Sequence, residues 1–194
     1  MVSKKIAVFA SGSGSNFEAI AKALQDGKIQ NAEISLLVTD KEGVFALDRA
    51  KKFGIESKTF VLKNFEDKVA YEKAILEALA EKEIDFIVLA GYMKLIGETL
   101  LSEYEGRMIN IHPSVLPAFK GKDAIAMALD YGVRYTGVTV HWVDSGMDTG
   151  QIIDQDVVRV EKDDTYETLA EKIHKVEHVL YPRVINEVVN KNAE

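Results

Sequence analysis

Cysteine is absent from the 194-residue chain, which excludes disulfide bonds, thiolate nucleophiles and thiolate metal ligands. Proline is scarce, with three residues, and no segment has the composition of a linker or of a low-complexity tract. No apolar run reaches the roughly 18 residues that a membrane-spanning helix needs, so we expect no membrane partner. Residues 1–16 lack the pattern of a cleavable signal peptide, and we therefore expect a cytoplasmic protein.

Positive charge is also in deficit, since 24 lysines and arginines face 31 aspartates and glutamates, a formal net charge of −7. This balance disfavours a nucleic-acid partner, whose phosphates need a basic surface. Anionic small molecules are still compatible with it, because a few local donors decide such sites. The hydrophobic fraction of 47% is enough for one large core, and the length predicts a single domain over residues 1–194. No pattern decides between a monomer and a homodimer.

Short apolar runs alternate with segments of helical periodicity along the whole chain. We expect strands at 5–10, 34–38, 57–61, 84–90, 108–111, 137–143 and 151–160, and helices at 16–28, 43–53, 65–82, 123–131 and 165–191. The last two strands alternate in polarity and are joined by a short loop, so they are predicted to form an antiparallel hairpin at one edge. The pattern as a whole predicts an α/β fold. It is a single-domain, doubly wound, Rossmann-like and mostly parallel sheet of about seven strands, with helices on both faces.

Ligands of such sheets bind beyond the carboxyl ends of the strands, and the first loop there is glycine-rich. Residues 11–16 read SGSGSN and precede a helix, so backbone N–H groups and the helix dipole favour a phosphate. No Walker lysine follows, and Phe17 stands where a third glycine would complete a dinucleotide motif. A single phosphomonoester therefore fits better than a dinucleotide. The alternative is a tight turn with a helix cap, because Ser15 and Glu18 have capping-box spacing.

A second polar loop ends the strand at 108–111. Asn110 and His112 are two residues apart on an extended segment, so both side chains point to the same face. Pro113 then pushes His112 toward extended geometry and stops the strand. An amide and a protonated imidazole both donate hydrogen bonds, and together they can stabilise an oxyanion. The alternative is that the two side chains only satisfy buried backbone groups.

The third polar loop, residues 144–150, joins the two strands of the predicted hairpin and contains two aspartates and two glycines. One of these carboxylates can reach a histidine at a neighbouring strand end and favour its charged form, which keeps the ring a proton donor. The alternative is a polar hairpin loop with no role in chemistry. Calcium fits poorly, since the ligand spacing of an EF-hand is absent.

Metal binding and serine hydrolysis find little support elsewhere. Of the four histidines, His174 and His178 are four apart and share a helix face, but no HExxH motif accompanies them. We interpret them as a structural pair, and we expect no metal site. The absence of a GxSxG motif disfavours an α/β-hydrolase.

The three loops, in this order, closely resemble the phosphoribosylglycinamide formyltransferases, a branch of the formyltetrahydrofolate-dependent transferase family. The resemblance extends from residue 6 to residue 182, and the segments that carry it are AVFASGSGSNFEAI, IVLAGYMKLI, GRMINIHPSVLPAFKG, TGVTVHWVDSGMDTGQII and KIHKVEHVLYP. It implies transfer of a formyl group from 10-formyltetrahydrofolate, the co-substrate, to the amine of glycinamide ribonucleotide in purine biosynthesis. It implies no metal and no redox cofactor.

The resemblance also assigns roles to individual residues. Asn110, His112 and Asp148 are implied to be catalytic, with Asp148 holding His112 in its charged form. For the ribonucleotide, Gly12 and Ser13 shape the turn, Gly14, Ser15 and Asn16 hold the phosphate, and Glu177 contacts the glycinamide end. For the folate, the implied residues are Lys68, Met93, Lys94, Leu95, Ile96, Asn110, Val143 and Asp144. The N-terminal half is thus implied to bind the phosphoribosyl group, and the C-terminal half to bind folate and catalyse transfer.

Two positions depart from the family pattern. Lys68 stands where relatives often carry an arginine that meets the folate tail, and it keeps the charge but not the planar fork. Gln151 stands where many members have proline.

Other functions remain as alternatives. A formyl-folate hydrolase or a sugar-amine formyltransferase would share the middle motifs, but a hydrolase needs no cradle like residues 11–16. A methionyl-tRNA formyltransferase would need a further C-terminal domain and a basic surface. A non-catalytic nucleotide- or folate-binding module would be expected to lack Asn110, His112 or Asp148, and all three are present.

Overall fold

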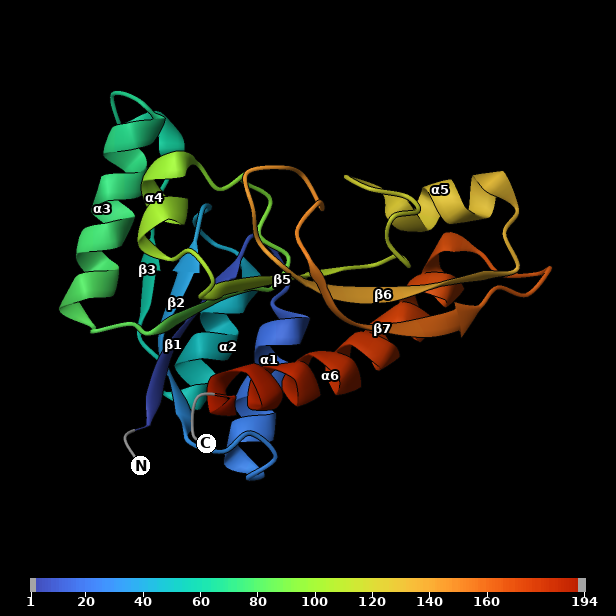
Figure 1. Cartoon of the computed structure of the whole chain (residues 1–194), viewed down its shortest axis with the longest axis horizontal. Helices are drawn as coiled ribbons and strands as arrows, with labels where there is room; N and C mark the ends of the chain where they lie inside the picture. The colour runs from blue at the N-terminus through green and yellow to red at the C-terminus, as the bar shows by residue number, and fades with distance from the viewer. Residues whose placement is uncertain (1–2, 192–194) are drawn as a thin grey trace.

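A sheet of seven strands forms the centre of the molecule, and the computed structural model describes residues 3–191. The strands are β1 (Lys4–Ala10), β2 (Ala32–Thr39), β3 (Ser57–Thr59), β4 (Phe86–Leu89), β5 (Met108–His112), β6 (Tyr135–Trp142) and β7 (Ile152–Arg159). Their order in the sheet is β3-β2-β1-β4-β5-β6-β7 (Figure 1). The first five run parallel, whereas β6 is antiparallel to both β5 and β7. The predicted α/β fold with an antiparallel edge hairpin is therefore confirmed.

Helices cover both faces of this sheet, because its strands are apolar on both sides. Ile6, Val8 and Ala10 of β1 face one core, which is closed by the first, second, fifth and last helices, and Ala7 and Phe9 face the other, closed by the third and fourth. Figure 1 shows the third and fourth helices together, away from the long last helix. The helices are α1 (Ser15–Gln25), α2 (Phe45–Phe53), α3 (Lys68–Glu81), α4 (Glu98–Glu103), α5 (Ala124–Tyr131) and α6 (Tyr166–Asn190), with a 3₁₀ turn, η1, at Leu62–Asn64.

Two predicted boundaries in the segment before α3 are wrong for local reasons. The strand predicted at 57–61 ends at Thr59, and η1 follows it. The helix predicted from residue 65 begins at Lys68, because the Asp67 side chain accepts a hydrogen bond from the Ala70 N–H (2.7 Å) and caps the first turn.

Helix α4 is absent from the sequence prediction and depends on a contact from another helix. The buried carboxylate of Glu72, on α3, accepts hydrogen bonds from the backbone N–H groups of Gly97 (2.6 Å) and Leu100 (3.2 Å). These are N–H groups at the start of α4 that have no partner within the helix. A six-residue helix is too short to be stable alone, so the hydrogen bonds to Glu72 are needed to stabilise its first turn.

Helix α6 is fixed to the central strands β4 and β5 by one buried hydroxyl. Tyr181 is fully buried, and its hydroxyl donates to the carbonyl oxygens of Leu89 in β4 (2.7 Å) and Ile109 in β5 (3.3 Å). The helix therefore packs at a defined height against the strand ends where the polar loops begin.

The turn between β1 and α1 requires a glycine at one position. Gly14 is the residue before α1, with φ of 72°, and a Cβ there would lie 2.7 Å from the Cβ of Ala46. No side chain caps this helix, so the capping box considered as the alternative for Ser15 and Glu18 is not formed. The Glu18 carboxylate instead pairs with Arg49 and Lys52 of α2.

We predict that Gly14→Ala lowers the free energy of unfolding by about 1–3 kcal/mol, because alanine disfavours positive φ and its methyl group meets α2. Gly12→Ala is the matched control, since nothing lies within 4 Å of its added Cβ. It should change stability by less than about 0.5–1 kcal/mol. Urea denaturation of the two variants measures the difference, and equal losses would contradict this account of the turn.

Candidate active site

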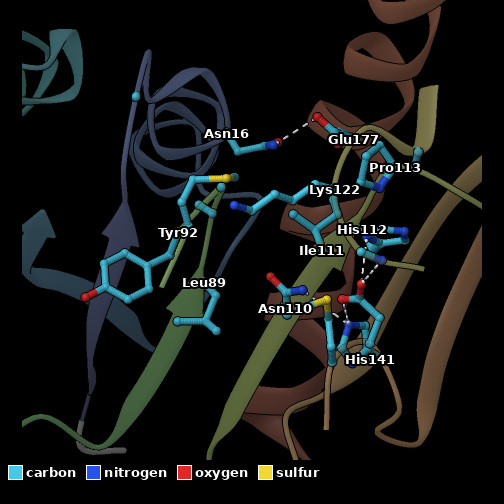
Figure 2. Close-up of a pocket in the computed structure, with 18 of the residues that line it drawn as sticks. Asn16, Leu89, Tyr92, Asn110, Ile111, His112, Pro113, Lys122, His141 and Glu177 are labelled. Carbon is cyan, nitrogen blue, oxygen red and sulfur yellow. Dashed lines mark hydrogen bonds and ion pairs between the residues drawn. The ribbon is translucent and has the colours of Figure 1, made fainter. Parts of the chain in front are cut away.

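A cleft of about 500 Å³ opens at the carboxyl ends of the parallel strands. Its walls come from the loops after β1, β4, β5 and β6 and from α6, and Figure 2 shows part of the lining. The residues singled out in the sequence that line it are 12–16 with Glu177, 93–96 with Val143 and Asp144, and Asn110, His112 and Asp148. Residues far apart in the sequence thus meet in one space.

Lys68 is the one such residue that does not line the cleft. Its Nζ lies 3.9 Å from Oε1 of Glu72, one helical turn away on α3. The lysine therefore points to the carboxylate that caps α4, and its side chain is about half exposed.

The strand β5 places Asn110 and His112 on neighbouring positions of one face, as the period of two predicts. Across the antiparallel pair, Asn110 is opposite His141 and His112 is opposite Thr139. Both histidines are buried, with 4% and 3% of their surface exposed. A buried polar group needs partners, and the loops on either side supply them.

Both nitrogens of the His112 ring face oxygen acceptors. Nε2 lies 2.8 Å from the carbonyl oxygen of Phe119, and since a carbonyl only accepts, Nε2 carries a proton. Nδ1 lies 3.4 Å from Oδ2 of Asp148. Only the doubly protonated ring can donate to both partners, so the geometry suits an imidazolium.

Asp148 connects three parts of the site. Its Oδ2 accepts a hydrogen bond from the Gly121 N–H (2.8 Å), and its Oδ1 lies 3.6 Å from Nε2 of His141. Burial acts to raise the pKa of Asp148, but the His141 ring, the Gly121 N–H and the charge of His112 together lower this pKa below its ordinary value. The carboxylate is therefore ionised near neutral pH. The backbone of Asp148 has a φ of 53°, a conformation in which few residues other than glycine lie.

The sequence analysis missed the part that His141 plays here. Its Nδ1 donates to the carbonyl oxygen of Trp142 (2.7 Å), and its Nε2 lies 3.2 Å from the side-chain nitrogen of Asn110 and 3.6 Å from Oδ1 of Asp148. Figure 2 shows the two side chains close together beside His112. A histidine next to the valines of this strand was the available signal, but its partner on β5 depends on the register of the sheet.

The glycine-rich loop at the other end of the cleft is held by its neighbours. The Gly12 carbonyl oxygen accepts from the Ala46 N–H (3.1 Å), and the Ser13 carbonyl oxygen accepts from Nε of Arg49 (2.8 Å). The Ser11 hydroxyl accepts from the Met93 N–H (2.8 Å) and joins this loop to residues 93–96. Carbonyl groups of the loop are thus bound to the protein on the side away from the cleft.

Asn16 and Glu177 form a buried contact between the start of α1 and the middle of α6. The Asn16 amide donates to Oε2 of Glu177 (2.9 Å), as the dashed line in Figure 2 shows. Burial raises the pKa of Glu177, while the Asn16 hydrogen bond and the nearby His174 act to lower it. Oδ1 of Asn16 is buried and has no hydrogen-bond partner among residues 3–191.

The histidine pair on α6 packs as two stacked rings. The ring centroids of His174 and His178 are 6.3 Å apart, with 14° between the planes. Burial lowers the pKa of His178, and the nearby His174 and Arg49 add to this effect. Within the described part of the chain, no group of three or more histidine, aspartate or glutamate side chains is placed to hold a metal ion. Nor does any helix there have the length and apolar composition to cross a membrane.

Comparison with known proteins gives a consistent result. Residues 4–185 match the family model described as formyl transferase. The chain is 51% identical over 189 residues to a phosphoribosylglycinamide formyltransferase of Bacillus subtilis (strain 168), covering 97% of this chain and 96% of that protein. The crystal structure of phosphoribosylglycinamide formyltransferase from Bacillus halodurans superposes with a TM-score of 0.94 at 50% identity, covering 98% of this chain and 97% of that one. Glycinamide ribonucleotide transformylase 1 from Geobacillus kaustophilus gives a TM-score of 0.93 at 51% identity, with 96% and 98% covered. The chain therefore belongs to the formyl transferase family, and within it to the phosphoribosylglycinamide formyltransferases.

Proposed function

We propose that this enzyme transfers the formyl group of 10-formyltetrahydrofolate to the amine of N1-(5-phospho-D-ribosyl)glycinamide. The products are the formylglycinamide ribonucleotide and tetrahydrofolate, in purine biosynthesis. The observation that carries the proposal is the convergence of Asn110, His112 and Asp148 in one cleft, with the glycine-rich loop at its other end. Formyl transfer to an amine needs donors for an oxyanion, a proton carrier and an anchor for the phosphate, and this cleft contains candidates for each.

Asn110 and His112 are the proposed oxyanion donors. The substrate amine attacks the formyl carbon, and negative charge develops on the formyl oxygen. The Asn110 amide has two N–H groups, and no more than one of them faces Nε2 of His141, which leaves an N–H group for this oxygen. His112 donates to the same oxygen by exchanging its bond to the Phe119 carbonyl for one to the substrate.

Asp148 is proposed to keep His112 charged and oriented during transfer. Its depressed pKa means that it stays a carboxylate at neutral pH, where it faces Nδ1 of His112. The attacking amine loses a proton and N10 of the folate gains one as it leaves. We propose that this proton moves through His112 or through a water molecule, so that no metal ion and no other cofactor takes part.

The two substrates are proposed to occupy opposite ends of the cleft. Residues 12–16 hold the phosphate through backbone N–H groups, and Asn16 with Glu177 contacts the rest of the ribonucleotide. Residues 93–96, Val143 and Asp144 form the folate pocket, where the exposed side chains of Met93 (56%) and Leu95 (51%) can cover a flat ring. Lys68 would meet the folate tail only by turning away from Glu72.

The domain assignment follows from the same placement. We propose one formyltransferase domain over residues 1–194, acting on small molecules as a monomer or a homodimer in the cytoplasm. Its N-terminal half supplies the phosphate loop, and its C-terminal half supplies Asn110, His112 and Asp148. The division is not complete, because Glu177 of α6 lies beside Asn16 and residues 93–96 lie in the first half.

The proposed reaction is tested by following the loss of 10-formyltetrahydrofolate in the presence and absence of glycinamide ribonucleotide. We expect loss only when both are present, with formylglycinamide ribonucleotide formed in equal amount. Loss of formyl folate without the ribonucleotide would instead favour a hydrolase. Transfer to an amino sugar but not to the ribonucleotide would favour a sugar-amine formyltransferase.

We predict that Asp148→Asn lowers turnover by about 10²–10⁴-fold, because the His112 ring loses its anionic partner. Asparagine tolerates the positive φ at this position, so the fold should be retained. Asp130→Asn makes the same change of charge on an exposed position of α5 outside the cleft and serves as the control. Steady-state kinetics with both substrates measures the effect, and near-normal turnover of Asp148→Asn would refute the assigned role.

Chelators should leave the activity intact, because the proposed steps use only side chains and water. The measurement is the transfer rate before and after dialysis against EDTA. Activity that is lost on dialysis and restored by zinc would show that the mechanism lacks an essential component.

A further inference from the structure

The phosphate end of the cleft lacks an obvious cation. The loop at residues 12–16 contains only glycine, serine and asparagine, so its own side chains add no positive charge. A phosphomonoester carries a charge of about −1.5 to −2 at pH 7. Within residues 3–191, four carboxylates line the cleft, namely Asp123, Asp144, Asp148 and Glu177, against two lysines and no arginine. A lysine or arginine that is not already paired would therefore strengthen the binding of a dianion by the backbone N–H groups.

Two of the three nearby cations are already engaged by carboxylates. Arg49, next to the loop, pairs with Glu18 and donates to the Ser13 carbonyl oxygen. Lys94 lies with its Nζ 4.0 Å from Oδ2 of the buried Asp40. The side chain of Lys122 makes no ion pair and no hydrogen bond within the described residues, although it lines the same cleft. Figure 2 shows it extended into the cleft, with its ammonium group pointing away from its own loop.

The backbone that carries Lys122 is held by the catalytic residues themselves. The Phe119 carbonyl oxygen accepts from Nε2 of His112 (2.8 Å), and the Gly121 N–H donates to Oδ2 of Asp148 (2.8 Å). Both bonds hold the loop before substrate binds, and the bond from Gly121 to Asp148 is kept when His112 turns to the formyl oxygen. Lys122 follows Gly121 directly, so the backbone from which its exposed side chain extends is set relative to the reacting groups.

We propose that Lys122 binds the phosphate group of the ribonucleotide from across the cleft and determines affinity for phosphorylated substrates. The proposal rests on the proposed function for the identity of the ribonucleotide. Backbone N–H groups of residues 12–16 bind one side of the phosphate, and the ammonium group binds the other. A charge-assisted bond of this kind favours the phosphorylated sugar over the free one, so Lys122 acts in binding and not in the transfer of the formyl group.

The test is calorimetric titration of the full chain with ribose 5-phosphate and with inorganic phosphate. Lys122→Met keeps the length and the apolar stem but removes the charge, and it should weaken binding of ribose 5-phosphate by about 10- to 100-fold. Lys122→Arg keeps the charge and should stay within about threefold of the unmodified chain. Lys120→Met is the matched control, since Lys120 is exposed on the same loop but does not line the cleft, and it should leave affinity unchanged.

Three outcomes would overturn the proposal. Unchanged affinity in Lys122→Met would show that the ammonium group does not meet the phosphate. Equal losses in Lys122→Met and Lys120→Met would show only a long-range effect of net charge. A Michaelis constant of Lys122→Met that rises for the formyl folate and not for the ribonucleotide would place Lys122 at the folate tail.

Failure of this proposal is distinguishable from failure of the proposed reaction, because sugar-phosphate binding is measured without formyl transfer. If the chain binds ribose 5-phosphate through Lys122 but transfers no formyl group, the proposed role of Lys122 stands and the proposed reaction fails. If the Lys122→Met variant transfers the formyl group as well as the unmodified chain at low ribonucleotide concentration, the proposed reaction stands and the proposed role of Lys122 fails.

Discussion

The carboxylate of Asp148 is the contact on which the arrangement of the site depends. Its two oxygens face His112 on β5, His141 on β6 and the backbone of Gly121 in the loop before α5. These groups belong to three separate segments of the chain. The Asp148 side chain contacts all three through ion pairs and a hydrogen bond. Removing the charge would leave two buried histidines and a loop without their common acceptor, which is costly in a low-dielectric interior.

The backbone is strained at two residues of the site, one of which carries this carboxylate. Asp148 and Phe119 both have positive φ, a conformation that costs a side-chain-bearing residue free energy on the order of 1 kcal/mol. Each is held by a bond to the site, through the Asp148 carboxylate in one case and the Phe119 carbonyl oxygen in the other. The strain persists because the hydrogen bonds around His112 determine the positions of both residues, and it coincides with the groups assigned to chemistry.

The sequence predicts the features that local pattern determines. Runs such as 84–90 are apolar on both faces, which indicates a covered parallel sheet, and the spacing of Asn110 and His112 puts both on one side of a strand. It does not predict what depends on distant partners. Helix α4 needs Glu72 from α3, and His141 needs the register of β5 with β6. In each case the deciding contact lies outside the window in which periodicity operates.

Glu177 and Tyr181 are four residues apart on α6, so they share one face of the helix and lie about 6 Å apart along its axis. One contacts Asn16 beside the glycine-rich loop, and the other donates to backbone carbonyl oxygens of β4 and β5. About one turn of helix α6 thus sets the spacing between the glycine-rich loop and the strand that carries Asn110. Lengthening the cleft would therefore require a change in the position of helix α6, and shortening the side chains that line the cleft would not be enough.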